Sequence, residues 1–311
     1  MEQMLRFARL GNSAEADGLD LETVASVAAP LNVDILLRGE TGTGKDTLAE
    51  MIHSLSGRKG QFVAINCAAI PETLAESQLF GVTTGAFTGA TQSRPGYIET
   101  ANKGTLYLDE IDSMPLNLQA KLLRVLEARG VQRLGSTQFI PVDMNVIASA
   151  QNSLTEMVER GQFRQDLYFR INVVSIELPA LRTRRERIAP LFISFIRREA
   201  SELDRTTELP SPKLLQALVS YSWPGNVREL RSAAKRYVLG LNPLPHVEST
   251  RSSNRLKLKD NLEQFEKLLI EDCLRRHHRC INAAASELAI SRRTLYHRMK
   301  YLNISRRDEE A

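Results

Sequence analysis

The stretch "VDILLRGETGTGKDTLAEMIHSL", residues 33–55, decides the fold of the first half of the chain. It contains "GETGTGKD", residues 39–46, which matches the pattern G-x-x-x-x-G-K between an apolar strand-like run and a helix-like run. The glycines allow backbone N–H groups to turn toward phosphate oxygens, and Lys45 can reach the β- and γ-phosphates. A chance glycine-rich turn is the alternative, but the flanking strand and helix favour a nucleotide-binding loop.

The loop departs from the usual motif at one position. Asp46 stands where a Ser or Thr normally follows the lysine, and Thr47 comes next. The residues predicted to bind the nucleotide from this motif are Gly39, Glu40, Thr41, Gly42, Thr43, Gly44, Lys45, Asp46 and Thr47.

A second apolar run, "TLYLDE" at residues 105–110, ends in the adjacent carboxylates of Asp109 and Glu110. Ligands of parallel sheets bind at the carboxyl ends of the strands, so both side chains are expected beside the phosphate loop. Asp109 is predicted to hold Mg²⁺, and Glu110 to orient and deprotonate an attacking water. A surface acidic pair is the alternative, but such a pair does not normally follow a buried strand.

Apolar runs alternate with helical patterns on both sides of these motifs. The runs "QFVAINCAAI", "VDMNVIASA" and "NVVSIELP" suit buried parallel strands, so we expect an α/β domain with a parallel sheet. Only helices are expected from about residue 187 to 241, followed by the Pro- and Ser-rich stretch "NPLPHVESTRSSN" and an all-helical end. The expected parts are an α/β domain at 1–186, a helical lid at 187–240, a linker at 241–260 and a small all-α domain at 261–311.

The composition excludes several classes of protein. No stretch approaches the ~18 apolar residues of a membrane span, and the N-terminus lacks the pattern of a signal peptide. The three cysteines, Cys67, Cys273 and Cys280, are scattered and odd in number, which favours a reducing, cytoplasmic compartment without a membrane partner. Residues 251–311 carry 14 Lys and Arg against 9 Asp and Glu, so the net positive charge lies in the tail. This asymmetry hints at nucleic acid, although a solvated basic surface is the commoner explanation.

The tail sequence "INAAASELAISRRTLYHRMKYL", residues 281–302, has the apolar spacing of a helix-turn-helix, with Asn282 and Ser291 as expected N-caps. Its second helix carries polar side chains suited to phosphates and base edges in a major groove. A basic helix that packs on its own domain is the alternative. The residues predicted to bind DNA are Asn282, Ser291, Arg292, Arg293, Thr294, Tyr296, His297, Arg298 and Lys300.

The ordered set of motifs resembles the NtrC-type enhancer-binding proteins, the AAA+ activators of sigma-54 RNA polymerase. The shared segments include "GETGTGKD", "ESQLFG", "GAFTGA", "GTLYLDEI", "GQFRQDLYFRINVV" and "WPGNVREL", and they run in the family's order from about residue 36 to 230. The resemblance implies an AAA+ P-loop domain with a parallel sheet and a helical lid, followed by a Fis-type helix-turn-helix. It also implies ATP and Mg²⁺ as cofactors, and sigma-54 RNA polymerase holoenzyme and enhancer DNA as partners.

The hexapeptide "GAFTGA" at residues 85–90 is the most diagnostic of these segments. In the family this loop projects from the face of a hexamer and its aromatic side chain contacts sigma-54, while ATP hydrolysis moves it to remodel the closed promoter. A plain hairpin with Phe87 folded into the core is the alternative, but loops more often carry function. The residues implied to contact sigma-54 are Gly85, Ala86, Phe87, Thr88, Gly89 and Ala90.

The resemblance assigns further roles in the ATPase site. Asn66 matches the polar switch that holds the catalytic Glu110, and Arg228 matches the second sensor in the lid. Arg164 and Arg170 match a pair of arginine fingers that reach a neighbouring subunit's γ-phosphate, although ordinary salt bridges to Asp166 or nearby acids are the alternative. Fingers acting in trans imply a ring oligomer.

This chain also departs from the family pattern. The first sensor usually ends in Thr-Asn, whereas Ala150 and Gln151 stand here, so Gln151 keeps an amide for the γ-phosphate but the hydroxyl is missing. ATP turnover by the chain alone is therefore expected to be slow, and a hetero-oligomer with a related activator subunit is a hypothesis beside a homo-oligomer. In the tail, Ala289 replaces the usual turn glycine, at an expected cost of about 1 kcal/mol if φ is positive.

Only about 38 residues precede Gly39, too few for the receiver or sensing domain that most members carry. The chain resembles the subgroup without such a domain, which includes paired activators of type III secretion (virulence) genes in plant-pathogenic bacteria. Control would then fall to expression level or to a separate regulatory protein on the AAA+ domain. Two alternatives to sigma-54 activation remain: an AAA+ ATPase that remodels another target, and a DNA-binding regulator with an impaired ATPase that needs a partner subunit.

Overall fold

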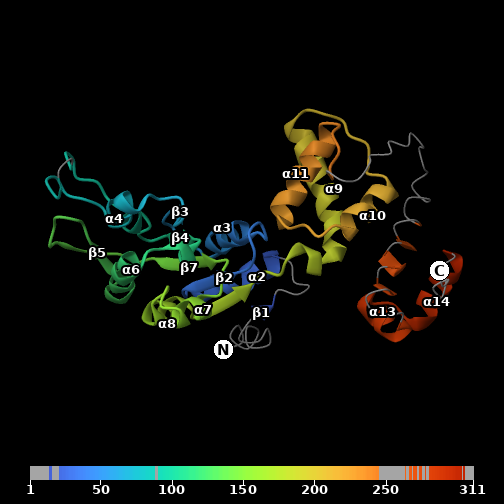
Figure 1. Cartoon of the computed structure of the whole chain (residues 1–311), viewed down its shortest axis with the longest axis horizontal. Coiled ribbons are helices and arrows are strands. Elements are labelled where there is room, and N and C mark those ends of the chain that lie inside the picture. The colour runs from blue at the N-terminus through green and yellow to red at the C-terminus, as the bar shows by residue number, and fades with distance from the viewer. Residues whose placement is uncertain are drawn as a thin grey trace. The chain divides into compact units, whose positions relative to one another are not determined.

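The computed structural model describes residues 14–15, 21–87, 90–244, 263, 266–267, 269–271, 273–274, 277, 280–302 and 304 (Figure 1). Its contacts divide the chain into two compact units, each described below by itself. One comprises residues 1–183 with 225–228, and the other residues 184–224 with 229–311. No helix among the described residues is long and apolar enough to cross a membrane.

The first unit is built on the parallel sheet that the sequence predicts. Its six strands lie in the order β1-β8-β2-β7-β4-β3, and every neighbouring pair is parallel. A separate antiparallel pair, β5 with β6, forms a hairpin. The strands are β1 (Ala14–Glu15), β2 (Ile35–Arg38), β3 (Phe62–Asn66), β4 (Thr105–Asp109), β5 (Gly130–Gln132), β6 (Phe139–Pro141), β7 (Asn145–Ala150) and β8 (Val174–Glu177).

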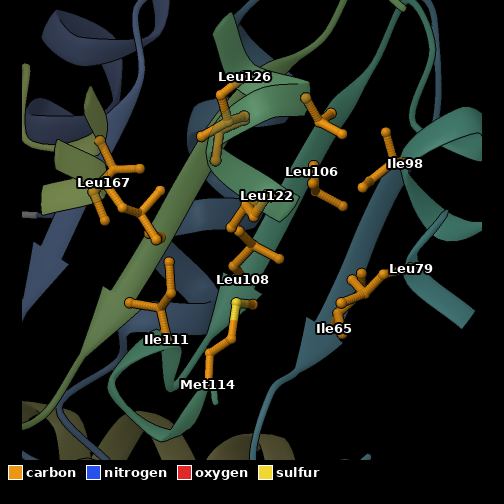
Figure 2. Close-up of a cluster of buried hydrophobic side chains, with 14 of the residues drawn as sticks. Ile65, Leu79, Ile98, Leu106, Leu108, Ile111, Met114, Leu122, Leu126 and Leu167 are labelled. Carbon is orange, nitrogen blue, oxygen red and sulfur yellow. The ribbon is translucent and has the colours of Figure 1, made fainter. Parts of the chain in front are cut away.

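Helices cover both faces of this sheet, which explains why its strands are apolar throughout. In β2, Leu36 packs in one core cluster while its neighbours Ile35 and Leu37 pack in the other. Figure 2 shows the first cluster, where side chains such as Leu122 and Leu167 meet the strands. The helices are α2 (Leu21–Ala28), α3 (Lys45–Leu55), α4 (Glu72–Phe80), α5 (Tyr97–Thr100), α6 (Leu116–Ala128), α7 (Leu154–Glu159) and α8 (Gln165–Ile171), with 3-10 turns η1 (Ala29–Leu31), η2 (Ile111–Ser113) and η3 (Leu181–Thr183).

The expected helical region follows the sheet. It consists of α9 (Arg185–Glu202), α10 (Pro212–Ser220) and α11 (Asn226–Val238). Trp223 is fully buried, and its indole N–H donates to the carbonyl oxygen of Leu218 at 2.7 Å. The buried Glu199 accepts from Arg231 at 2.7 Å, which ties α9 to α11. Most of the expected linker lies outside the described residues, and the predicted part boundaries stay predictions.

The C-terminal end contains the two expected helices, α13 (Ile281–Glu287) and α14 (Arg292–Tyr301). Ser291 caps α14 and accepts from the backbone N–H of Thr294, as predicted. The prediction that Asn282 is the N-cap is wrong. The helix α13 begins at Ile281, so Cys280 occupies the N-cap position and Asn282 lies inside the helix. Ala289 has φ of 53°, so the turn does place an alanine in the left-handed region. The apolar core of this end includes Ala285, Leu288, Ile290, Leu295 and Met299.

Candidate functional site

The phosphate loop joins β2 to α3 and bends sharply at its glycines. Gly42 and Gly44 have φ of 78° and 104°, a region that favours glycine. A Cβ atom at Gly42 would lie 2.4 Å from the carbonyl oxygen of Gly225, so a side chain does not fit there. Gly44 is the N-cap residue of α3, which leaves the helix N-terminus open toward an anion.

Lys45 is buried within this loop. Its Nζ donates to the carbonyl oxygens of Gly39 at 2.7 Å and Glu40 at 3.1 Å. Burial lowers the pKa of Lys45, and the nearby carboxylates of Asp109 and Asp46 oppose that shift. The ammonium group therefore lies where phosphate oxygens can take over from the two carbonyl groups.

Asp109 ends β4 at the carboxyl edge of the sheet, the position that the sequence predicts. Its Oδ1 accepts from the hydroxyls of Ser149 at 2.5 Å and Tyr107 at 3.1 Å, and its Oδ2 accepts from the amide of Asn66 at 3.1 Å. The Tyr107 hydroxyl also lies 2.8 Å from Oδ1 of Asp46, and burial raises the pKa of Tyr107, which keeps that hydroxyl protonated. A hydroxyl has one proton, so at any moment Tyr107 donates a hydrogen bond to either Asp46 or Asp109.

Glu110 follows immediately and has φ of 54°, an uncommon backbone conformation for a non-glycine residue. Its backbone N–H donates to Oγ of Ser149 at 3.1 Å, and its carbonyl oxygen accepts from the N–H of Ser113 at 2.9 Å. Glu110 thus follows β4 at the carboxyl edge of the sheet, the edge at which the phosphate loop follows β2.

Asn66 contacts a different carboxylate from the one expected. Its amide donates to Asp109 rather than to Glu110, and its Oδ1 accepts from the backbone N–H groups of Ala68 at 2.9 Å and Ala69 at 3.0 Å. The turn after β3 therefore fixes the amide and aims its N–H₂ group along the sheet edge. In this conformation Asn66 orients Asp109.

Gln151 lies beside the phosphate loop, as its sensor assignment requires. Its Oε1 accepts from the hydroxyl of Thr41 at 2.6 Å. Ala150 is fully buried in the core cluster on one face of the sheet, so its methyl group faces away from the carboxylates. Ser149, one residue earlier on the strand, points to the other face, and its hydroxyl donates to Asp109.

A polar cluster joins the phosphate loop to Arg182 and Asn226, for which the sequence predicts no contact with the loop. Arg182 forms a two-pronged ion pair with Glu40, which lowers the pKa of Glu40 to about 2. Asn226 is buried and has φ of 51°. Its amide N–H₂ donates to the carbonyl oxygen of Thr41 at 3.0 Å and to the carboxylate of Glu40 at 3.2 Å. Its Oδ1 accepts from the backbone N–H of Leu181 at 2.8 Å. Asn226 is thus the first residue of α11 and binds the phosphate loop.

Arg228 reaches the same loop through its backbone. Its N–H donates to the carbonyl oxygen of Gly42 at 3.3 Å, and a Cβ atom at Gly42 would lie 3.1 Å from the Cβ atom of Arg228. The start of α11 therefore packs against the phosphate loop, where the family resemblance places a second sensor.

The two candidate finger arginines have different surroundings. Arg164 is the N-cap residue of α8, and its guanidinium forms an exposed ion pair with Asp166 at 3.0 and 2.7 Å. Arg170 is in the last turn of α8 and pairs with the buried Asp34, and it also donates to Leu126 O at 3.1 Å. Both side chains therefore form the salt bridges that the alternative interpretation expects. The exposed pair of Arg164 contributes little to stability, whereas the pair of Arg170 with the buried Asp34 contributes much more.

Replacing Arg170 with alanine is expected to lower the free energy of unfolding by about 3 kcal/mol, because the buried carboxylate of Asp34 loses its main partner. Arg164→Ala is the matched control and should leave the free energy of unfolding nearly unchanged, because its ion pair is exposed. Urea unfolding followed by circular dichroism measures both values. Equal losses for the two variants would contradict the structural role of Arg170.

The loop at residues 85–90 presents an aromatic side chain to solvent. Phe87 is 48% exposed, so the alternative in which it folds into the core does not describe this structure. Gly85 has φ of 82°, and its N–H donates to Ala90 O at 2.9 Å, while the N–H of Ala90 donates to Phe87 O at 3.0 Å. Thr88 and Gly89 lie outside the described residues. These bonds close a short turn with Phe87 near its tip.

The second helix of the C-terminal motif presents most of the predicted DNA-binding side chains. Arg298 is the exception, because its guanidinium pairs with both carboxylate oxygens of Glu266 and lies 5.2 Å from the ring centroid of Tyr301. Arg298 therefore holds the fold of this end together. The exposed polar side chains of α14 are Arg292, Arg293, Thr294, Tyr296, His297 and Lys300.

The same end brings Cys273, His277 and Glu287 together, with one candidate metal-ligand atom from each within 4.8 Å of the others. His277 Nε2 contacts the carboxylate of Glu287, and the thiol of Cys273 lies 3.7 Å from the carbonyl oxygen of Ala284. These contacts link the segment before α13 to α13 itself, which accounts for the cluster as packing.

Protein-family models match three consecutive segments of the chain. The model described as a Sigma-54 interaction domain matches residues 12–177, and an AAA+ ATPase lid domain model matches residues 182–243. The model described as a bacterial regulatory protein of the Fis family matches residues 261–302. The fold predicted from the motifs is thus confirmed.

Two curated relatives and one solved structure illustrate the similarity. The pathogenicity locus probable regulatory protein WtsA of Pantoea stewartii subsp. stewartii is 57% identical over 285 residues, covering 92% of this chain and 88% of the relative. The protein HrpS of Pseudomonas syringae pv. syringae, of the same description, is 57% identical, covering 92% and 94%. The crystal structure of NtrX from Brucella abortus in complex with ADP is 31% identical with a TM-score of 0.67, covering 91% of this chain and 68% of that chain.

Proposed function

This chain belongs to the NtrC-type, sigma-54-dependent transcriptional activators, and from that premise we propose that it couples ATP hydrolysis in a ring oligomer to remodelling of sigma-54 RNA polymerase. The observation that carries the proposal is that the phosphate loop with Lys45 and the pair Asp109 and Glu110 follow parallel strands at the same edge of the sheet, in a chain that also exposes Phe87. A motor site and an exposed contact loop are the two parts that such a machine needs.

In this proposal the phosphate loop binds ATP, with Lys45 replacing its carbonyl contacts by contacts to the β- and γ-phosphates. The carboxylate of Asp109 and that of Asp46 fit a hard divalent cation, and bound Mg²⁺ would neutralise charge that develops on the phosphates. Glu110 orients the attacking water and accepts its proton. Gln151, already in contact with Thr41, reports the state of the γ-phosphate to the loop.

Arginine fingers complete the site from the neighbouring subunit. Arg164 is the better placed of the two, because its exposed pair with Asp166 costs little to open. The pair between Arg170 and Asp34 is stronger, so Arg170 reaches a neighbour only after a change in α8. Assembly into a ring would make hydrolysis depend on the concentration of the chain.

The C-terminal end would hold the ring at enhancer DNA through α14. Its exposed arginines can neutralise phosphates, and Thr294, Tyr296 and His297 can reach base edges. The printed names of two relatives refer to pathogenicity loci, so virulence genes, including those for type III secretion, are the proposed targets.

The DNA-binding role predicts a defined salt dependence. Arg293→Ala is expected to weaken binding and to lower the magnitude of the slope of log K against log salt by about 1, because one phosphate contact is lost. A gel-shift titration of the full chain on its enhancer at several salt concentrations measures both effects. Arg160→Ala is the control and should change neither, because Arg160 is an exposed arginine directly after α7, far in the chain from α14. An unchanged slope in Arg293→Ala would move the DNA site away from this face of α14.

A second candidate function is a DNA-binding regulator whose own ATPase is impaired and which needs a related subunit. Ala150 favours it, because the usual sensor hydroxyl is absent. The intact set of Lys45, Asp109 and Glu110, with Ser149 beside them, favours independent hydrolysis.

The proposed function is tested by promoter opening in a purified system. The chain, sigma-54 holoenzyme and a supercoiled template with a sigma-54 promoter are mixed with ATP, and with a slowly hydrolysed ATP analogue as the control. Permanganate-reactive bases should appear at the promoter only with ATP. Opening that is equal with the analogue would contradict coupling to hydrolysis, and no opening beside rapid ATP turnover would favour another target.

A further inference from the structure

Ser149 lies at the centre of the ATPase site, although no motif selects it. Its side chain is fully buried near the end of β7. Its Oγ donates to Asp109 Oδ1 at 2.5 Å and accepts from the backbone N–H of Glu110 at 3.1 Å. One hydroxyl therefore contacts both members of the carboxylate pair.

The sheet register explains how this contact arises. β4 and β7 are neighbouring parallel strands in which Leu108 pairs with Ala148, so the next residue on each strand, Asp109 and Ser149, lie side by side. Side chains alternate between the faces of a strand, and Ala148 and Ala150 both pack in the core cluster on one face. Ser149 consequently points to the other face, and a hydroxyl at position 150 would not reach Asp109 in this way.

The contact to Glu110 stabilises an uncommon backbone conformation. A left-handed backbone at a non-glycine residue costs on the order of 1 kcal/mol or more and persists only where surrounding bonds fix it. At Glu110 those bonds are the N–H to Ser149 and the carbonyl to the N–H of Ser113. Loss of the Ser149 hydroxyl leaves the N–H without its acceptor and loosens the residue that positions the water.

The contact to Asp109 fixes the other carboxylate. Oδ1 of Asp109 accepts from Ser149 and from Tyr107, and Oδ2 accepts from Asn66. The Ser149 bond is the shortest of the three, and the Tyr107 proton is shared with Asp46. Ser149 is therefore the principal group that sets the rotation of the Asp109 side chain.

We propose that Ser149 is a positioning residue for ATP hydrolysis, which fixes the backbone of Glu110 and the carboxylate of Asp109. This inference rests on the proposed ATPase function.

The test compares Ser149→Thr with Ser149→Val in the full chain, because Thr and Val have similar shapes and only Thr keeps a hydroxyl. The rate kcat of Ser149→Val should be about 10- to 100-fold below that of Ser149→Thr. The affinity for a fluorescent ATP analogue should agree between the two variants, since the phosphate loop is the same. The thermal unfolding midpoint of Ser149→Val should be the lower one, because the partly buried N–H of Glu110 loses its acceptor.

Ser175→Ala is the matched control on the neighbouring region of the sheet. Its Oγ is buried with no hydrogen-bond partner among the described residues, so its loss should leave kcat unchanged. If the wild-type chain turns over ATP and Ser149→Val matches Ser149→Thr, the positioning role is overturned while the ATPase stands. If the wild-type chain shows no turnover above Glu110→Gln, the proposed ATPase function itself is overturned.

Discussion

Glu110→Gln is expected to abolish ATP turnover while nucleotide binding stays close to that of the wild-type chain. The amide keeps the size of the side chain and the left-handed backbone but does not accept a proton from the attacking water. Loss of a general base typically costs about 10²- to 10⁴-fold in rate. Phosphate release measures turnover, and the fluorescence of a bound nucleotide analogue measures affinity.

Lys45→Ala is the matched variant for this prediction, because it should remove binding itself. Lys45 is buried among the loop carbonyls, where the phosphates are expected, and it also partly neutralises the nearby carboxylates. Lys45→Ala should therefore lose nucleotide affinity, whereas Glu110→Gln should keep the affinity and lose turnover. If both lose affinity to the same extent, the division of roles between Lys45 and Glu110 is wrong.

Phe87→Ala is the second prediction with a large effect: ATP hydrolysis should stay near the wild-type rate while promoter opening is lost. Phe87 is 48% exposed, so its truncation leaves no cavity in the core. An aromatic side chain at the centre of an interface can be worth 2 kcal/mol or more, about 30-fold in affinity. Hydrolysis and permanganate footprinting are measured on the same preparation.

Leu55→Ala is the control for Phe87→Ala. Leu55 ends α3 and is 52% exposed, so its truncation removes a similarly exposed apolar side chain from a different surface. It should leave both hydrolysis and opening intact. A collapse of the ATPase in Phe87→Ala would show that the loop supports the fold of the motor and would contradict its role as a contact for sigma-54.

The main elements of the fold follow from local sequence patterns. The phosphate loop, the strand that ends in Asp109 and the capping serine Ser291 each depend on a few consecutive residues, and each is found where the sequence places it. Ala289, at the position where the family's turn usually has glycine, has the positive φ that this resemblance implies. Such elements can be predicted because the residues that determine their conformation are close together in the sequence.

The network around the carboxylates could not be predicted in the same way. Ser149 reaches Asp109 only because β4 and β7 are neighbours in one particular register, and nothing local to "IASAQN" indicates it. The partner of Arg170, Asp34, is 136 residues away in sequence. The amide of Asn66 donates to Asp109 and not to Glu110, because backbone N–H groups in the turn after β3 fix its orientation. Contacts between distant segments need the tertiary structure.

The most direct test of the central claim is a trapping experiment. The purified chain is mixed with sigma-54, ADP and aluminium fluoride, which together mimic the transition state of ATP hydrolysis, and complexes are separated by native gel electrophoresis. We expect a stable complex that requires aluminium fluoride and disappears with Phe87→Ala. A chain that hydrolyses ATP but traps no sigma-54, or a complex that survives Phe87→Ala, would contradict the claim that this motor acts on sigma-54 through its exposed loop.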